Sequence, residues 1–270
     1  MLTLVANEAQ SLKEFTENNY AQASFFWNYL IKNKEIKVNG KKVGSDIRLS
    51  VGDVVCYYLT PKQQSKAAFS VLYEDESVLV ADKESGVNSE AVFAALSREK
   101  EIYFIHRLDR NTRGLMIFAK TANAEKSLLN AFKEKRAEKI YHALCVGELR
   151  KECDTITAYL QKDETRASVK VFDTPRSGAE TIVTEYKVLS FEKEVSKVEI
   201  TLHTGKTHQI RAHLAHIGNP VLGDMKYGNT QVNKKYNKSR QCLVAKSLRL
   251  SVPELPAIDG KTFFSAFDAE

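Results

Sequence analysis

The sequence predicts an α+β protein in two parts, a small N-terminal α/β unit and a larger unit built on a mixed, largely antiparallel sheet. Short β-branched or aromatic runs, closed by turn formers, outnumber the segments with helical spacing. Strands follow one another without regular alternation with helices, which favours antiparallel pairing. A polar stretch without periodicity, residues 61–68, separates the two parts as a linker. With 270 residues, the chain is long enough to bury a sizeable core.

The N-terminal unit, residues 1–60, combines a helical segment with a small sheet. Apolar residues recur at helical spacing across residues 11–30, which predicts a helix. Residues 36–41 are two short runs around Asn39-Gly40, a dipeptide that favours a tight hairpin turn. Residues 48–55 then predict a turn and a closing strand.

The larger unit, residues 69–270, is predicted to contain many strands and few helices. The strands are expected at residues 71–73, 77–81, 102–105, 115–119, 140–146, 198–202 and 244–250. Helical spacing predicts helices at residues 121–138 and 207–217. The inward stripe of the first of these helices is expected to comprise Leu128, Leu129 and Phe132. Residues 227–241 are predicted to form a polar, basic loop.

A charged loop, residues 106–114, lies between two of the predicted strands. Its residues are too polar to continue either strand, so Asp109 is expected in a loop held at both ends by the sheet. A reactive carboxylate needs such a placement on a rigid support. Taken alone, the loop fits equally well with an exposed surface segment in which Arg and Asp pair by chance.

Composition and motifs exclude several classes of protein. No apolar run approaches the eighteen residues of a membrane span, and the N-terminus lacks the basic and apolar segments of a secretory signal. The four cysteines are scattered without a C-x-x-C spacing, which fits reduced thiols in a cytoplasm. A phosphate-binding G-x-x-x-x-G-K-[ST] loop and a dinucleotide G-x-G-x-x-G turn are both missing. The net charge of +6 permits a polyanionic partner without proving one.

A histidine cluster raises the question of a metal. The sequence contains no H-E-x-x-H motif, and no carboxylate lies between the first and last histidine of this cluster. We therefore predict no metal and regard a metal hydrolase as a weak third alternative. The histidines concerned are His203, His208, His213 and His216.

Three motifs in this order resemble the RluA-type family of RNA pseudouridine synthases. They are H-R-L-D-x-x-T-x-G at residues 106–114, K-x-Y at residues 139–141 and T-G-x-T-H-Q-I-R-x-H at residues 204–213. The resemblance covers the chain from about Phe69 to the C-terminus and implies a pseudouridine synthase fold for that part. The N-terminal unit resembles the S4 RNA-binding domain through I-x-V-N-G-K-x-V at residues 36–43 and L-x-x-G-D-x-V at residues 49–55.

This resemblance implies an enzyme that isomerises specific uridines to pseudouridine in structured RNA, with large-subunit ribosomal RNA favoured. The reaction breaks the N1–C1′ bond and rejoins the base through C5, so it needs no cofactor, but it needs a pocket for an extruded base. The expected partner is RNA, and the expected state is a cytoplasmic monomer. Two alternatives remain open, a non-catalytic RNA-binding protein that kept the fold and a synthase directed at transfer RNA.

By the same resemblance, three residues are expected to carry the chemistry. Asp109 matches the family's catalytic carboxylate, and Arg211 matches the arginine that keeps this carboxylate charged. Tyr141 matches a tyrosine that packs on the target base and assists proton movement at C5. Its alternative role is that of a core aromatic, which is the usual role of a strand tyrosine.

Several further residues are expected to bind the substrate or to brace the site. Arg107 matches an arginine thought to enter the space that the base vacates, with a phosphate contact as the alternative. His106 and His208 are expected to brace the hydrogen bonds around the Asp109 loop, and Lys206 stands where the family has arginine. The remaining candidates are Thr112 in the loop and, for the phosphates of RNA, Lys37, Lys41 and Lys42 in the N-terminal unit.

Two departures from the family pattern put the local shape of the site in doubt. Lys83-Glu84-Ser85-Gly86 stands where the family has K-P-x-G, so the rigid proline is missing. Arg113 replaces the serine that usually follows Thr112, which places a long cation in a loop built for a small side chain.

Overall fold

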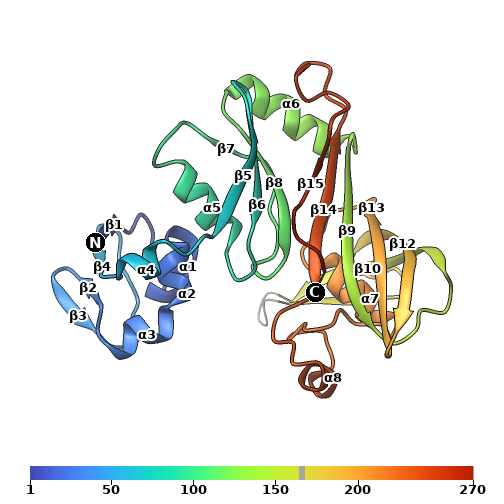
Figure 1. Ribbon diagram of the computed structural model, residues 1–270, viewed down its shortest axis with the longest axis horizontal. Helices are drawn as coiled ribbons and strands as arrows, with labels where there is room; N and C mark the ends of the chain where they lie inside the picture. The colour runs from blue at the N-terminus through green and yellow to red at the C-terminus, as the bar shows by residue number, and fades with distance from the viewer. Residues whose placement is uncertain (164–167, 270) are drawn as a thin grey trace.

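The computed structural model describes residues 1–163 and 168–269 and confirms the predicted α+β class. The N-terminal unit lies at one end of the molecule, and a large sheet runs through the rest (Figure 1). Along the part of the chain that is described, no helix has both the length and the apolar composition needed to cross a bilayer.

The N-terminal unit pairs a four-stranded sheet with three short helices. The strands run in the order β1 (Leu2–Val5), β4 (Val54–Tyr57), β2 (Ile36–Val38) and β3 (Lys41–Val43). The helices are α1 (Leu12–Asn19), α2 (Ala21–Phe25) and α3 (Trp27–Lys32). The prediction of one helix over residues 11–30 was therefore wrong. Tyr20 adopts an extended conformation with φ −146° and ψ 90°, and this break turns α2 and α3 so that Leu30 joins Phe15 in a single buried core.

The predicted hairpin at Asn39-Gly40 is confirmed. Both residues have positive φ angles, 48° and 80°, as a tight turn between antiparallel strands requires. The Asn39 side chain also accepts a hydrogen bond from the Val54 N–H (2.9 Å), which ties the hairpin to β4. A single-turn helix, α4 (Pro61–Gln64), lies within the predicted linker and begins with a capping box at Thr60.

Among the residues that the structure describes, the larger unit is built on an eleven-stranded sheet in which β8 and β14 pair in parallel while their neighbours pair antiparallel. The main path runs β11 (Ser168–Phe172), β10 (Cys153–Asp163), β12 (Glu180–Glu192), β13 (Val195–Leu202), β9 (Ala137–Val146), β14 (Leu243–Leu250), β8 (Arg113–Ala119), β6 (Val78–Lys83) and β5 (Phe69–Glu74). Off this path, β7 (Tyr103–Phe104) pairs with β8 and β15 (Thr262–Phe264) pairs with β14.

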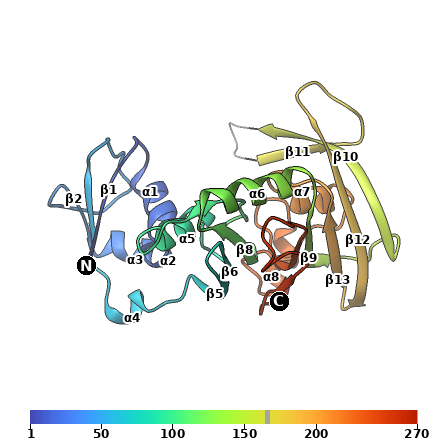
Figure 2. The same cartoon turned by 90° about the horizontal axis from the view of Figure 1, so that it is seen from above.

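This sheet is accompanied by the helices α5 (Ser89–Leu96), α6 (Ala122–Lys133), α7 (Gln209–His216) and α8 (Thr230–Lys235). Alternate residues of β6 and β8 pack into two different apolar cores, one containing α5 and the other α6, so these helices cover opposite faces of the two strands. Helix α7 packs against β10–β12 through Ala212 (Figure 2). Strands β6 and β8 are thereby buried on both faces and form a rigid base for the loop before β8.

Two details of the predicted helix at residues 121–138 and one predicted loop were wrong. Helix α6 ends at Lys133 rather than Glu138, because Lys135 takes a positive φ of 60° and the chain turns into β9. Leu129, expected to face inward, is 42% exposed. The predicted loop at residues 227–241 contains the short helix α8, which begins where the Asn229 side chain accepts two backbone N–H groups.

Gly114 allows the Asp109 loop to enter β8 directly beside β14. Its φ is +111°, and a Cβ atom at this position would lie 2.3 Å from the carbonyl oxygen of Ala245, its partner in the parallel pair. We therefore expect Gly114→Ala to destabilise the protein by more than about 1 kcal/mol in urea unfolding. Gly260→Ala is the matched control, because Gly260 has a φ of +69° but open space around it. An equal loss in both variants would contradict the close approach as the cause.

Candidate active site

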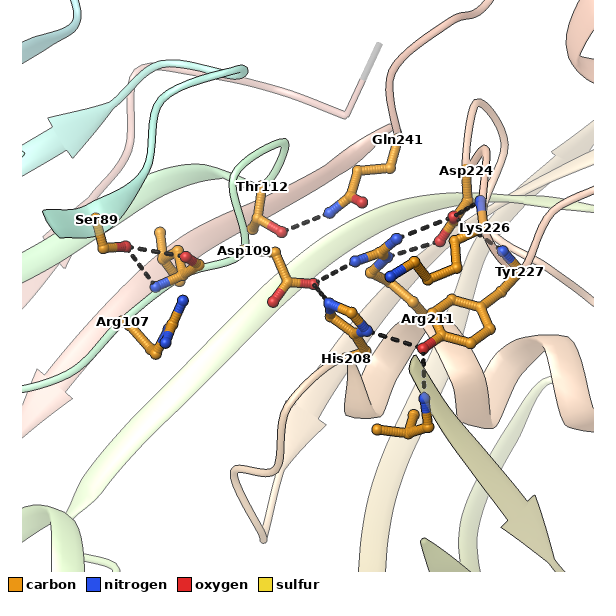
Figure 3. A network of polar contacts seen from close by, with 12 residues as sticks. Ser89, Arg107, Asp109, Thr112, His208, Arg211, Asp224, Lys226, Tyr227 and Gln241 are labelled. Carbon is orange, nitrogen blue, oxygen red and sulfur yellow. Dashed lines mark hydrogen bonds and ion pairs between the residues drawn. The ribbon is translucent and has the colours of Figure 1, made fainter. Parts of the chain in front are cut away.

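Backbone hydrogen bonds hold the loop that carries Asp109 on the C-terminal side of this residue. The Thr112 N–H donates to the Asp109 carbonyl (3.0 Å), and the Gly86 N–H donates to the Arg110 carbonyl (2.8 Å). On the other side of Asp109, the Ser89 hydroxyl and the backbone of Leu108 exchange two hydrogen bonds of 2.9 Å (Figure 3). The Asp109 carboxylate therefore projects from a loop with little freedom to move.

The Asp109 carboxylate meets a guanidinium from a distant helix. Arg211 Nη1 donates to Asp109 Oδ2 at 2.7 Å, while Arg211 Nε and Nη2 donate to the two oxygens of Asp224 at 2.7 and 3.1 Å (Figure 3). The bidentate contact with Asp224 fixes the plane of the guanidinium, so Nη1 is aimed at Asp109. The structure thus brings together Asp109 and Arg211, the pair expected from the sequence.

Burial and charge act against each other within this group. Burial by itself lowers the pKa of Arg211, but the hydrogen bonds and charge of Asp224 and Asp109 outweigh burial and raise it above its ordinary value. Burial by itself raises the pKa of Asp224, whose side chain is 0% exposed. The hydrogen bond and charge of Arg211, together with the backbone N–H groups of Lys226 and Tyr227, outweigh burial and lower this pKa. Arg211 and Asp224 are therefore both charged at neutral pH, and Asp224 is the internal counterion that holds the arginine in place.

His208 and Tyr227 extend the network on the other side of Asp109. The Val169 N–H donates to the Tyr227 hydroxyl oxygen (2.9 Å), which lies 2.8 Å from His208 Nδ1. Donation by the Tyr227 hydroxyl to Nδ1 leaves the ring hydrogen on Nε2, which is 4.0 Å from Asp109 Oδ2. Burial lowers the pKa of His208 despite the nearby Asp109 charge, so the imidazole is neutral at pH 7. His208 has a φ of 55° and precedes α7, instead of lying within the predicted helix.

A cleft of about 560 Å³ opens above these groups, within the size range of small-molecule sites. Tyr141 lines it from β9, and its side chain shares the buried face of that strand with Ala143 and Cys145, as the alternation predicts. Burial, followed by the Asp109 charge, raises the pKa of the Tyr141 hydroxyl above its ordinary value, so this group is protonated at neutral pH. The cleft thus combines the Asp109 carboxylate, the protonated phenol of Tyr141 and the apolar side chains of Leu202 and Leu243.

Two residues that were predicted to bind the substrate form contacts within the protein that support the Asp109 loop. Thr112 is 3% exposed, and its hydroxyl oxygen accepts a hydrogen bond from Gln241 Nε2 at 2.6 Å. The His106 ring stacks on Phe132 with centroids 4.8 Å apart, and its Nε2 accepts the Ile117 N–H (3.1 Å). Burial lowers the pKa of His106 to about 3, so the ring is neutral. Both side chains therefore brace the loop, and a direct contact of either with the substrate stays a prediction.

The other predicted contacts lie at the rim of the cleft or outside it. The Arg107 side chain is 69% exposed, with Nη2 3.3 Å from Glu90 Oε1, and Lys206 Nζ lies 2.6 Å from Glu180 Oε1. Both residues line the cleft. Lys37, Lys41 and Lys42 lie on the β2–β3 hairpin of the N-terminal unit, which forms a separate surface.

The two departures from the family pattern contact each other. Arg113 Nε lies 3.3 Å from Glu84 Oε2, and the Arg113 guanidinium lies 5.0 Å from the Phe267 ring. Lys83 is fully buried and donates to the carbonyls of Glu84 (3.1 Å), Val87 (2.9 Å) and Arg110 (3.2 Å). Burial lowers the pKa of Lys83 to about 7. The segment without proline is thus held by an ion pair and a buried amine.

Three residues of the site were given no role from the sequence, namely Asp224, Tyr227 and Gln241. Residues 218–224 and Tyr227 follow the third family motif and share its resemblance to the family, but no spacing rule connects Asp224 to Arg211 thirteen residues earlier. The remaining histidines have separate partners, since His203 contacts Glu185, His213 contacts Thr184 and His216 contacts Asp173. Within residues 1–163 and 168–269, no group of three or more potential metal ligands is found.

Comparisons with known proteins agree on one family. The chain matches the model of a family described as RNA pseudouridylate synthase over residues 77–216. A ribosomal large subunit pseudouridine synthase C of Vibrio vulnificus (strain CMCP6) is 29% identical over 252 residues, which cover 83% of this chain and 79% of the Vibrio protein. A protein of Aquifex aeolicus (strain VF5), named as an uncharacterized RNA pseudouridine synthase, is 31% identical over 83% of this chain and 78% of its own length. The solved structure of human RNA Pseudouridylate Synthase Domain Containing 1 has a TM-score of 0.62 and 26% identity, covering 74% of this chain and 83% of the human chain.

Proposed function

Because the chain belongs to the family of RNA pseudouridine synthases, we propose that Asp109 is its catalytic carboxylate and that large-subunit ribosomal RNA is its substrate. The observation that carries the first part is the fixed Arg211 guanidinium, which places its Nη1 2.7 Å from Asp109 Oδ2 at the cleft. The relative from Vibrio vulnificus, named as a large-subunit synthase and matched over most of its length, supports the second part.

In the proposed mechanism, the target uridine leaves the base stack and enters the cleft. The N1–C1′ bond breaks, the uracil turns, and C5 bonds to C1′; C5 then loses its proton and N1 gains one, so no atoms are gained or lost overall. The Asp109 carboxylate acts as a nucleophile toward the uridine or stabilises positive charge at the sugar. Arg211 is its counterion and orients it, and Asp224 keeps Arg211 in place.

Arg107 is the proposed group that faces the vacated position in the RNA. Unstacking a base costs a few kcal/mol, and a planar cation can recover part of this by occupying the space left behind. The high exposure of the Arg107 side chain at the rim of the cleft is consistent with this role. The lysines of the β2–β3 hairpin would hold RNA phosphates at a distance from the cleft.

Tyr141 is proposed to assist proton transfer at C5. We expect Tyr141→Phe to fold normally and to bind RNA, but to lower kcat about a hundredfold because the hydroxyl is lost. Steady-state pseudouridine formation is the measurement. Tyr186→Phe is the matched control, since Tyr186 is another buried strand tyrosine but does not line the cleft. Full activity of Tyr141→Phe would assign this residue to packing alone.

The RNA substrate is tested by mapping pseudouridines in cells with and without the gene. The expected result is the loss of one or more pseudouridines from large-subunit ribosomal RNA, restored by the wild-type gene but not by the gene for Asp109→Asn. A loss confined to transfer RNA would contradict the proposed substrate while leaving the chemistry intact.

A further inference from the structure

The N-terminal unit contacts the Asp109 loop at the residue that follows Asp109. Arg110 Nη1 forms an ion pair with Glu17 Oε1 of α1, and Arg110 Nη2 donates to the Ser24 hydroxyl of α2 at 3.2 Å. Its third nitrogen, Nε, donates to the Gly86 carbonyl at 3.2 Å. One side chain of the catalytic loop is thus bound by both units.

The backbone of Arg110 is held as firmly as its side chain. Its carbonyl accepts hydrogen bonds from the Gly86 N–H (2.8 Å) and from the buried Lys83 amine (3.2 Å). Because Arg110 is bonded directly to Asp109, a rotation of the Arg110 backbone would also turn the carboxylate away from Arg211.

The contact around this ion pair is extensive. Asn18 Oδ1 accepts a hydrogen bond from Asn88 Nδ2 (2.8 Å), and the Asn19 carbonyl accepts one from the Arg98 guanidinium. Ala21 is 4% exposed and packs within the apolar core that also contains α5. Helix α1 lies beside α5 in both views of the molecule (Figures 1 and 2). The N-terminal unit is therefore docked on the catalytic unit through a packed interface and is not held by the linker alone.

We propose that Arg110 is a positioning residue through which the docked N-terminal unit sets the orientation of Asp109. This inference rests on the proposed role of Asp109. It gives the N-terminal unit a second role, because the unit would contribute to the rate of the chemical step as well as hold RNA through its lysines. Glu17, whose side chain is only 18% exposed, supplies the charge that holds Arg110 in this position.

The test is the steady-state kinetics of Glu17→Gln in the full-length protein. This change removes the charge but keeps the shape of the side chain. We expect kcat to fall about tenfold with KM within twofold of wild type, because a small misplacement of a catalytic group slows the chemistry more than binding. Glu17→Asp keeps the charge and should recover part of the lost kcat, which a purely structural role of the side chain would not explain.

Glu74→Gln is the matched control. Glu74 forms its ion pairs with Lys100 and Lys120 of the catalytic unit and does not line the cleft, so its replacement should leave kcat and KM as in wild type. A wild-type kcat in Glu17→Gln, an increased kcat, or a raised KM alone would each overturn the positioning role. If the wild-type protein itself made no pseudouridine, the proposed function would fail, and that outcome is distinct from a difference between variants.

Discussion

Asp109→Asn should abolish pseudouridine formation while the protein keeps its fold and its affinity for RNA. The amide has nearly the same shape as the carboxylate, but it carries no charge and is a poor nucleophile. Loss of a group that takes part directly in the reaction costs about 10⁴-fold or more in kcat. The fold should survive because Arg211 keeps its bidentate contact with Asp224.

The measurement is the release of tritium from RNA labelled at C5 of uracil, because forming the C5–C1′ bond expels the C5 hydrogen. RNA binding is measured in parallel by filter retention at fixed salt, since phosphate contacts depend strongly on salt. Asp154→Asn is the matched control, because Asp154 pairs with Lys151 at an edge of the sheet, away from the cleft. Turnover of Asp109→Asn at the wild-type rate would show that the catalytic assignment is wrong.

Short-range signals in the sequence predicted the parts of the fold that depend on neighbouring residues. The Asn39-Gly40 turn needs two positive φ angles, and few other dipeptides adopt them easily. The apolar runs on either side of the Asp109 loop form the strands β7 and β8. Strand β8 is almost entirely buried, and β7 pairs with it directly. The α1–α3 region was misjudged because helical spacing reports which side chains are apolar and does not reveal a break such as that at Tyr20.

The strands β10, β11 and β12 escaped prediction for a related reason. They form the outer part of the sheet, and exposed polar residues interrupt their apolar ones, as at Thr155 and Thr157. The pairing of β10 with β12 joins residues far apart in the sequence, such as Cys153 and Lys187, and no local pattern encodes such contacts. The same limit applies to the site. The sequence motifs indicated Asp109 and Arg211, whereas the roles of Asp224 and of the Glu17–Arg110 pair depend on contacts that only folding creates.

The second large effect is expected from Arg211→Met, which leaves the Asp224 carboxylate buried without its counterion. Breaking a buried ion pair by removing one partner costs about 3–5 kcal/mol, and the Asp224 side chain is 0% exposed. We expect urea unfolding at pH 7 to show a loss of this size, together with loss of activity. A loss below about 1 kcal/mol would mean that water reaches the Asp224 carboxylate in the variant and that the Arg211–Asp224 ion pair contributes little to the free energy of unfolding.

The pH dependence of this loss separates an unpaired charge from lost packing. In the wild type, the pKa of folded Asp224 lies below its unfolded value, so its stabilisation is present above the unfolded pKa and is lost as the pH falls through the folded pKa. In Arg211→Met, burial without a counterion raises the folded pKa above the unfolded value. The sign of the contribution therefore reverses, and the deficit relative to wild type should shrink as the pH falls from 7 to 5. A deficit that stays constant with pH would point to packing.

Combining Arg211→Met with Asp224→Asn removes both charges and should recover much of the lost stability at pH 7, because replacing both partners of a buried pair is often close to neutral. The double variant should nevertheless stay inactive, since Asp109 has lost the guanidinium that orients it. Stability and catalysis would then depend on different members of one network, because Asp224 stabilises the buried Arg211 and Arg211 holds the proposed catalytic carboxylate of Asp109 at the cleft. Recovery of activity along with stability would contradict this order of dependence.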